Sequence, residues 1–360
     1  MADSGGHWKT LAEAQKLTSS TKVPGVFEED VKRNNILERM PVAQAAGTGK
    51  KIEWLREKTT TEDAVTEVGI GTQLSWASDI DYTEVESTLR TLYVQRKLDH
   101  YVEGIYGTYN NYQAQMLLET EKGLKRKVGD RILYADTTYG GAPTQFDGFH
   151  ALVAERGAPW AGSGTNSKLN MDMASGALSL HYLRTLLDAM KLGADEILVP
   201  PCIGMRLDEA YEERGFAEDI GDAGAVIRGI RSYLTKGLND IGKPILYFGG
   251  VPIIRTDYLV QEEDGTGTGG TSDIRAKYSS TAAYSIFVVK YGNLMERDPG
   301  ICYGYGGTEG QGDFYKMRMW DDLEDFDAAG IRLINYGSVL LGSTLCLGRI
   351  FDITDAEIVV

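Results

Sequence analysis

Two glycine-rich segments come closest to a phosphate-binding motif. Residues 265–270 read GTGTGG and match G-x-G-x-x-G, a pattern that binds a pyrophosphate only where a strand precedes it and a helix follows. Residues 261–264 are Gln, Glu, Glu and Asp, and because this negative charge would repel a pyrophosphate, we expect a loop. Residues 47–51 read GTGKK, but the phosphate-loop motif needs Gly in place of Gln44 and Ser or Thr in place of Lys51. This segment is predicted to be a turn that leads into a strand.

Motifs for nucleophilic and zinc chemistry are also incomplete. Ser163 lies between Gly162 and Gly164 as in a nucleophile elbow, but Ala161 stands where that motif has Gly. The flanking residues do not predict the strand, turn and helix that the elbow requires. No histidine has another at i, i+4, and no H-E-x-x-H motif occurs, so no zinc site is predicted. The histidines are His7, His100, His150 and His181.

An acidic cluster remains as a candidate cation site. The D-x-[DN]-x-[DN]-G order and the closing Glu of a calcium loop are absent from it. We interpret the cluster as a solvated acidic turn, with weak cation binding as the alternative. The sequence therefore predicts no catalytic, cofactor-binding or metal site, and no enzyme activity. The acidic residues are Asp321, Asp322, Glu324, Asp325 and Asp327.

Composition places the chain among globular proteins. It has 360 residues, of which 42% are hydrophobic and 25% charged, and this length predicts about two domains. The formal net charge of −15 argues against an extensive nucleic-acid-binding surface, because phosphate contacts need Lys and Arg. The basic run at residues 122–127 is interpreted as a solvated helix end, with a phosphate contact as the alternative. We expect neither a signal peptide nor a membrane span, because no apolar run is long enough.

The cysteines are few and far apart in the sequence. Their odd number and wide spacing predict neither a disulfide framework nor a zinc site. Free cysteines are typical of a reducing compartment. They are Cys202, Cys302 and Cys346.

The first part of the chain predicts elements that have little core of their own. Residues 1–45 contain two short helical patterns and are expected to form an arm that docks on another surface. Residues 46–95 predict two strands around a Thr-rich tip, and such a ribbon needs a partner surface to be stable in water. Residues 97–128 predict the longest helix, which Gly129 would end. Further strands are predicted at residues 130–138 and 143–155.

From about residue 178 the pattern changes to alternating helices and strands, which is typical of a mixed α/β region. A flexible loop is expected at residues 261–276. Helices are predicted at residues 180–190, 205–214 and 225–238. Strands are predicted at residues 196–199, 243–259, 282–292, 315–320 and 337–350.

Several local phrases carry a resemblance to a known family. They are TLAEAQKL followed by GVFEEDVKRNNILERMPV, then KPILYFGGVPIIRTDYL, AAYSIFVVKYG and the ending IRLINYGSVLLGST. Together with the order of arm, ribbon, long helix and α/β region, they resemble the major capsid proteins of tailed double-stranded-DNA phages, which have the Hong Kong 97-type capsid fold. The resemblance covers nearly the whole chain and rests on patterns of apolar residues and turns.

The resemblance implies an α+β fold with four parts: an N-terminal arm, an extended β-ribbon loop, a peripheral domain with a long spine helix, and an axial domain that packs around the capsomer axis. The implied bounds are 1–45 for the arm, 46–88 for the extended loop, 89–177 with 308–333 for the peripheral domain, and 178–307 with 334–360 for the axial domain.

The resemblance also implies a homo-oligomer that works by self-assembly. Pentamers and hexamers would build an icosahedral phage head, the virion capsid, which is assembled in the host cytoplasm and encloses double-stranded DNA without sequence-specific binding. Portal and scaffolding proteins are implied partners, and decoration proteins are optional ones. A separate scaffold is expected because no long coiled segment begins the chain. We expect no covalent cross-link through Lys50, Lys51 or Lys58.

Two alternatives stay open. An encapsulin-type nanocompartment shell would share the fold and enclose a cargo enzyme instead of DNA. An α/β enzyme built on residues 178–307 would belong to another class, and it predicts a pocket with convergent titratable groups in a monomer or small oligomer.

Overall fold

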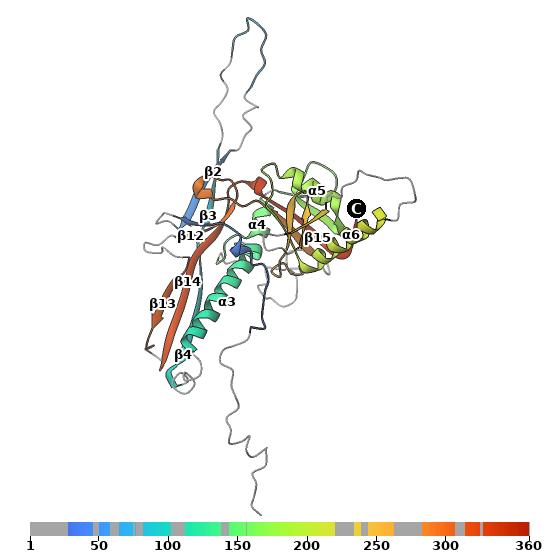
Figure 1. Ribbon diagram of the computed structural model, residues 1–360. Coiled ribbons are helices and arrows are strands. Elements are labelled where there is room, and N and C mark those ends of the chain that lie inside the picture. The colour runs from blue at the N-terminus through green and yellow to red at the C-terminus, as the bar shows by residue number, and fades with distance from the viewer. Residues whose placement is uncertain are drawn as a thin grey trace, which may run out of the picture.

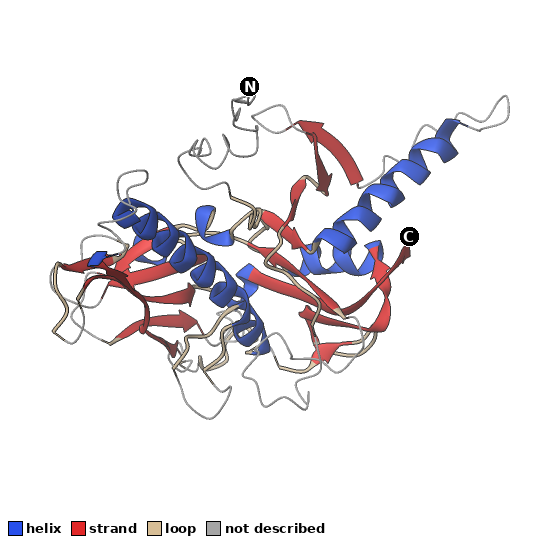
Figure 2. Ribbon diagram, turned by 90° about the horizontal axis from the view of Figure 1, so that it is seen from below, coloured by secondary structure: helices blue, strands red, loops and turns tan. Residues whose placement is uncertain are grey.

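A computed structural model of the chain shows an elongated lobe, a compact lobe and a two-stranded ribbon (Figure 1). The view from below in Figure 2 shows one long helix in each lobe. The structure describes residues 28–45, 50–57, 65–74, 76, 82–101, 112–137, 144–155, 157–219, 234–238, 244–262, 283–306, 314–324 and 327–359.

The long strand β14 is the centre of the sheet in the elongated lobe. One edge of β14 pairs with β4, and the other edge pairs with β13 near its beginning and with β12 near its end, all antiparallel. Strand β1 continues the sheet beside β12 in parallel. The bounds are β1 Val42–Ala45, β4 Arg90–Asp99, β12 Ile301–Gly306, β13 Lys316–Trp320 and β14 Ala328–Leu341.

Helix α3, Tyr112–Tyr134, lies along one face of this sheet (Figure 1). Its 23 residues span about 35 Å. Arg96 of β4 forms an ion pair with Glu119 of the helix at 3.9 Å, and Leu92 packs against the core that contains Val128. Because successive strand residues point to opposite faces, the even-numbered residues of β4 face α3 and the odd-numbered ones face away.

The prediction of a helix at residues 97–128 is wrong at both ends. Its first residues belong to β4, because they pair with β14, and residues 102–111 lie outside the described residues. At the other end α3 continues past Gly129 to Tyr134. Gly129 is needed there for close approach, because a Cβ at this position would collide with the side-chain amide of Asn35.

The ribbon consists of β2, Lys51–Glu57, and β3, Tyr82–Thr88, paired antiparallel in a single register. It confirms the predicted pair of strands, although the second predicted run divides at Leu89 into β3 and β4. The ribbon extends from the end of the elongated lobe where β12 and β14 pair (Figure 1).

The compact lobe is an eight-stranded mixed sheet in the order β5-β6-β15-β11-β7-β10-β9-β8. Helices α5 and α6 share a core with one face of the sheet, and α4 packs on the core of the other face with α3. The strands are β5 Pro159–Trp160, β6 Ser167–Ser179, β7 Glu196–Val199, β8 Leu234–Leu238, β9 Pro244–Phe248, β10 Val251–Arg255, β11 Tyr284–Val289 and β15 Leu347–Val359. The helices are α4 Phe149–Ala154, α5 Leu180–Ala189 and α6 Pro201–Asp219, with short 3-10 helices η1 Ile36–Glu38, η4 Leu294–Glu296 and η5 Thr344–Cys346.

The structure confirms most of the predicted α/β elements and corrects several others. Strands β7, β9, β10, β11 and β13 and helices α5 and α6 lie where the sequence predicts them. The strand predicted at 130–138 is wrong because residues 130–134 continue α3. The strand predicted at 143–155 is wrong because its apolar residues step by three and four and form helix α4. Residues 234–238 of the helix predicted at 225–238 form strand β8, held by pairing with β9. Within the described residues, the second helix predicted for the arm is replaced by the short 3-10 helix η1.

Candidate functional site

Among the described residues, those that the sequence offered for chemistry lie apart from one another. Ser163 lies in the loop between strands β5 and β6. His181 is exposed on α5. His100 lies at the end of β4, with its ring Nε2 3.0 Å from the carbonyl oxygen of Asp321 and 3.2 Å from Oδ1 of Asp322. His7, residues 265–270 and residues 47–49 lie outside the described residues.

The acidic turn and the cysteines were the remaining candidates. The side chain of Asp322 is 89% exposed, and the described part of the chain holds no group of three or more possible metal ligands. The three cysteines are free. Burial raises the pKa of the Cys346 thiol to about 11, which keeps it protonated and unreactive at neutral pH. No helix among the described residues is long and apolar enough to cross a membrane.

A cavity of about 500 Å³ lies between α3 and β4. It is lined by the cations Arg90, Lys127 and Arg131 and by apolar residues such as Leu92 and Phe146. Among the described residues, its lining holds no carboxylate, histidine, cysteine or serine.

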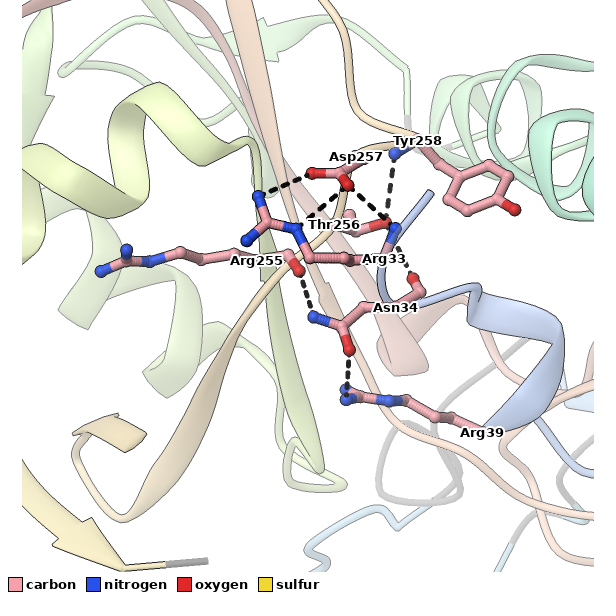
Figure 3. A network of polar contacts seen from close by, with 7 residues as sticks. All are labelled: Arg33, Asn34, Arg39, Arg255, Thr256, Asp257 and Tyr258. Carbon is pink, nitrogen blue, oxygen red and sulfur yellow. Dashed lines mark hydrogen bonds and ion pairs between the residues drawn. The ribbon is translucent and has the colours of Figure 1, made fainter. Parts of the chain in front are cut away.

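A network of polar contacts holds the N-terminal arm on the end of β10 (Figure 3). The backbone N–H of Arg33 donates to Oδ2 of Asp257 at 2.8 Å, and the backbone N–H of Asp257 donates to the carbonyl of Arg33 at 3.3 Å. Thr256 Oγ1 donates to the carbonyl of Asn34 at 2.9 Å. Asn34 has a φ of +56°, a left-handed conformation that Asn tolerates better than most residues. The arm therefore changes direction at Asn34 while its backbone is held on both sides.

Charge reinforces this attachment. The Arg33 guanidinium lies 3.2 Å from Oδ2 of Asp257. Burial acts to raise the pKa of Asp257, but the backbone and side-chain donors of Arg33 outweigh it, so the pKa lies below its ordinary value. Arg39 forms a second ion pair with Glu196 of β7, at 3.0 Å. Ile36, in the same segment of the arm, is fully buried. Residues 33–40 are therefore held by contacts with the rest of their own chain.

The basic run at residues 122–127 takes part in the same attachment. It lies within α3 and not at a helix end, so the prediction of a helix end is wrong. Its cations pair with carboxylates of the subunit: Lys122 and Arg126 with Glu28, Arg126 also with Asp30, Lys125 with Glu121, and Lys127 with Asp130.

The two faces of the ribbon differ. On the inner face, Ile52 and Trp54 pack against the small core around Cys302, the guanidinium of Arg56 donates to the carbonyl of Gly342 at 3.0 Å, and the Ser87 hydroxyl lies 2.6 Å from that of Ser338. The base of the ribbon therefore finds part of the partner surface that the sequence predicts it to need on its own chain. The outer face is exposed, and its residues are Lys51, Glu53, Leu55, Glu57, Tyr82, Glu84 and Glu86.

A buried ionic cluster links helix α4 to the sheet of the compact lobe, and sequence reasoning missed it. The Arg349 guanidinium of β15 donates to Glu262 at 2.9 Å and to the Ser285 hydroxyl at 2.9 Å. Nε2 of His150, on α4, lies 3.0 Å from the other Glu262 oxygen. Burial acts to raise the pKa of Glu262, but Arg349 and His150 outweigh it and lower the pKa to about 2. The members lie up to 199 residues apart, from position 150 to 349, and no local pattern links them.

Comparison of the whole chain with solved structures identifies its fold. No protein-family model and no curated protein matches the sequence. The holo-SrpI encapsulin complex of Synechococcus elongatus PCC 7942 contains a chain that matches with a TM-score of 0.62 at 12% identity, covering 98% of both chains. The capsid of the native GTA particle matches with a TM-score of 0.56 at 11% identity over 95% of this chain and 97% of that one. The capsid of cyanophage P-SCSP1u gives 0.54 at 12% identity, with 93% of each chain covered.

These matches cover nearly the whole chain and therefore include both lobes and the ribbon. The chain therefore has the α+β fold shared by phage capsid proteins and an encapsulin shell, the Hong Kong 97-type capsid fold expected from the sequence. At 10–13% identity over the similar structures, the likeness is one of fold, and the neighbours are shell proteins and not enzymes.

Proposed function

We propose that this protein is the major capsid protein of a tailed phage, which self-assembles into pentamers and hexamers of an icosahedral head around double-stranded DNA. In this proposal it resides in the virion and is assembled in the host cytoplasm with portal, scaffolding and optional decoration proteins. It works without a catalytic, cofactor or metal site. Its net charge of −15 keeps the enclosed DNA from adhering to the wall.

The observation that carries the proposal is the exposure of large apolar side chains on the segment between the ribbon strands. Each of five such residues is at least 49% exposed, and Ile70 and Trp76 are fully exposed. Clusters of this kind mark surfaces that bind a partner, and interfaces that bury them between permanent partners run to thousands of Å². The residues are Val65, Val68, Ile70, Leu74 and Trp76.

We also propose that the four parts of the chain have separate mechanical roles in the shell. We propose residues 1–45 as the arm, 46–88 as the extended loop, 89–177 with 308–333 as the peripheral domain, and 178–307 with 334–360 as the axial domain. Rings of subunits form by heterologous contacts that close by rotation, and α3, which lies along the sheet of the elongated lobe, stiffens that lobe.

Shortening the ribbon tests the proposal. Replacing residues 58–81 by a two-residue Asn-Gly turn joins Glu57 to Tyr82, which are already paired, and type I′ turns suit this connection. We expect the intact chain to form closed shells in electron micrographs and the shortened chain to remain a folded, soluble subunit with an unchanged circular dichroism spectrum. An intact chain that stays monomeric under all assembly conditions contradicts the proposal.

An encapsulin-type shell is the second candidate, and the match to the SrpI encapsulin at a TM-score of 0.62 favours it. The contents of particles purified from the source cells separate the two candidates. A phage head holds nuclease-protected double-stranded DNA, whereas a nanocompartment holds a stoichiometric protein cargo and no DNA.

A further inference from the structure

The cavity between α3 and β4 has the size of a small-molecule site. Strand β4 runs beside the helix (Figure 1), and Arg90 and Leu92 line the cavity from the strand. Lys127 and Arg131 line it from the helix. Its volume of about 500 Å³ lies within the range of about 300–1,000 Å³ that is typical of pockets for small organic ligands. The cavity therefore has room for a ligand larger than a single inorganic ion.

The lining of the cavity is positively charged. Lys127 Nζ lies 3.4 Å from Oδ2 of Asp130, and the Arg131 guanidinium donates to the neutral side-chain oxygen of Gln145 at 3.0 Å. Lys127 and Arg131 are four residues apart on the same helix, a spacing at which like charges repel. Because the described lining residues include these two cations and Arg90 but no carboxylate, the cavity favours an anion.

The guanidinium of Arg90 provides the point of attachment. Its Nε is shielded from solvent and has no hydrogen-bond partner among the described residues. A buried donor without an acceptor costs free energy, and the cost is larger for a charged group. A ligand that places an acceptor at Nε removes this cost. The planar guanidinium suits a carboxylate, because two of its nitrogens donate side by side to the two carboxylate oxygens.

Apolar side chains supply the interior of the cavity. Leu124 and Phe146 are 3% and 2% exposed, and Ala135 is fully buried. Lys127, in contrast, is exposed, so the cavity reaches from the surface of the lobe to its apolar core. An inorganic anion would leave these apolar walls uncovered, and a hydrocarbon would leave Nε of Arg90 without an acceptor. The lining therefore suits a molecule that has both parts.

We propose that this cavity binds a small amphiphilic carboxylate, with the carboxylate on the Arg90 guanidinium and the apolar body against Leu92, Leu124 and Phe146. Such a ligand contacts both β4 and α3, and it stabilises the folded elongated lobe by mass action. The inference goes beyond the proposed function, because all of these contacts lie within one subunit and need no shell.

Titration calorimetry with sodium octanoate tests the proposal on the unassembled, full-length chain. Arg90→Met removes the charged donors and keeps an apolar side chain of similar length. Arg96→Met is the matched control, because Arg96 lies on the same strand and the same face but outside the cavity, where it pairs with Glu119 at 3.9 Å. We expect octanoate to bind one-to-one, and its dissociation constant to rise by on the order of tenfold or more in Arg90→Met and to stay unchanged in Arg96→Met.

Two further ligands separate the contributions of the two parts. Octanol has the same chain length without the charge, and we expect it to bind weakly and equally to the unaltered chain and to Arg90→Met. Inorganic phosphate supplies the charge without the apolar body, and we expect it to bind weakly. Octanol that binds as tightly as octanoate would overturn the proposal, since the cavity would then be purely apolar. Phosphate that binds as tightly would also overturn it, since the apolar walls would then contribute nothing.

A photoreactive diazirine analogue of octanoate locates the site in the unaltered chain, so the test does not depend on the folding of a variant. We expect the label on peptides from β4 or α3, and circular dichroism checks the folding of both variants. The proposal is overturned if octanoate does not bind, if the label lies elsewhere, or if Arg96→Met weakens binding as much as Arg90→Met does. Failure of the chain to form shells would contradict the proposed function and leave this result unchanged.

Discussion

The compact lobe and the ribbon satisfy their side chains in different ways. In β11, at the centre of the eight-stranded sheet, the residues after Tyr284 are all buried, and Ile286 and Phe287 are 0% exposed on opposite faces. In β2 the residues alternate between exposed and half-buried, and Leu55 is 67% exposed. The side chains of β11 complete their packing within the subunit. Strand β2 leaves apolar and charged side chains exposed, where another surface could cover them. Under the proposed function, stability and assembly therefore depend on separate parts of one chain.

The largest loss is expected from the ionic cluster that links α4 to the sheet of the compact lobe. Glu262→Gln leaves the buried cation of Arg349 without its carboxylate, which costs about 3–5 kcal/mol of unfolding free energy. Urea unfolding of unassembled subunits measures it. Glu209→Gln, at a half-exposed carboxylate that pairs with Arg206, is the control and costs at most about 1 kcal/mol. Equal stabilities of the two variants would show that the cluster is not a structural joint.

The same carboxylate gives the unaltered protein an acid limit. The pKa of Glu262 in the folded subunit is about 2, below its ordinary value of 4.5. Because the folded-state pKa is the lower one, its contribution is fully present above about pH 4.5 and is lost as the pH falls toward 2. We expect the unfolding free energy to decline over this range, and the decline to be smaller in Glu262→Gln. A parallel decline in both proteins would contradict the assignment.

A core substitution in the compact lobe comes next in size. Ile286→Ala removes a fully buried side chain from the core shared with α5 and α6, at a cost of about 2–5 kcal/mol. Leu55→Ala on the ribbon is the matched control, and its effect on subunit stability is within about 0.5 kcal/mol. The comparison fails if the ribbon substitution destabilises the subunit as much as the core one.

The arm attachment has an intermediate effect. Asp257→Ala removes the acceptor of the Arg33 backbone and guanidinium donors and costs about 1.5–3 kcal/mol for a hydrogen bond to a charged group. Limited proteolysis in the arm checks the local consequence, which is faster cleavage near residue 33 with no change in the compact lobe. Cleavage at an unchanged rate would mean that Ile36 and its neighbours hold the arm without Asp257.

The smallest effect has an unusual sign. Arg318→Glu replaces the repulsion with Arg332 by an attraction, so the isolated subunit gains about 0.2–1 kcal/mol. Chemical unfolding of the unassembled subunit measures this gain. A variant less stable than the unaltered subunit would contradict the assignment of a repulsive pair.

Periodicity in the sequence predicted the compact lobe better than the elongated one. The buried runs at 196–199 and 284–289 are short, apolar and bounded by turns, so their strands were predictable. The residues of β4 read as the start of a helix because their strand character depends on pairing with β14, more than 200 residues later. Gly129 reads as a helix stop, yet it is retained inside α3 by the approach of Asn35. Long-range packing decided each of these cases.

The candidate site was less predictable than the fold. Arg33 and Asp257 are separated by 224 positions, and neither residue differs locally from an ordinary surface charge. The alternation of acidic residues in β2 and β3 is visible in the sequence, but the register that places Glu53 opposite Glu86 depends on the structure. The resemblance to capsid proteins predicted the order of the parts of the chain. The residues that hold those parts together are identified only by their contacts in the structure.

Hydrogen exchange of the backbone amides, compared between isolated subunits and assembled shells, tests the central claim most directly. The account predicts that the amides of β7 and β11 are equally protected in both states, whereas those of β2 and β3 gain strong protection only in shells. Ribbon amides as well protected in the isolated subunit as in the shell would contradict it, because the ribbon would then need no neighbour.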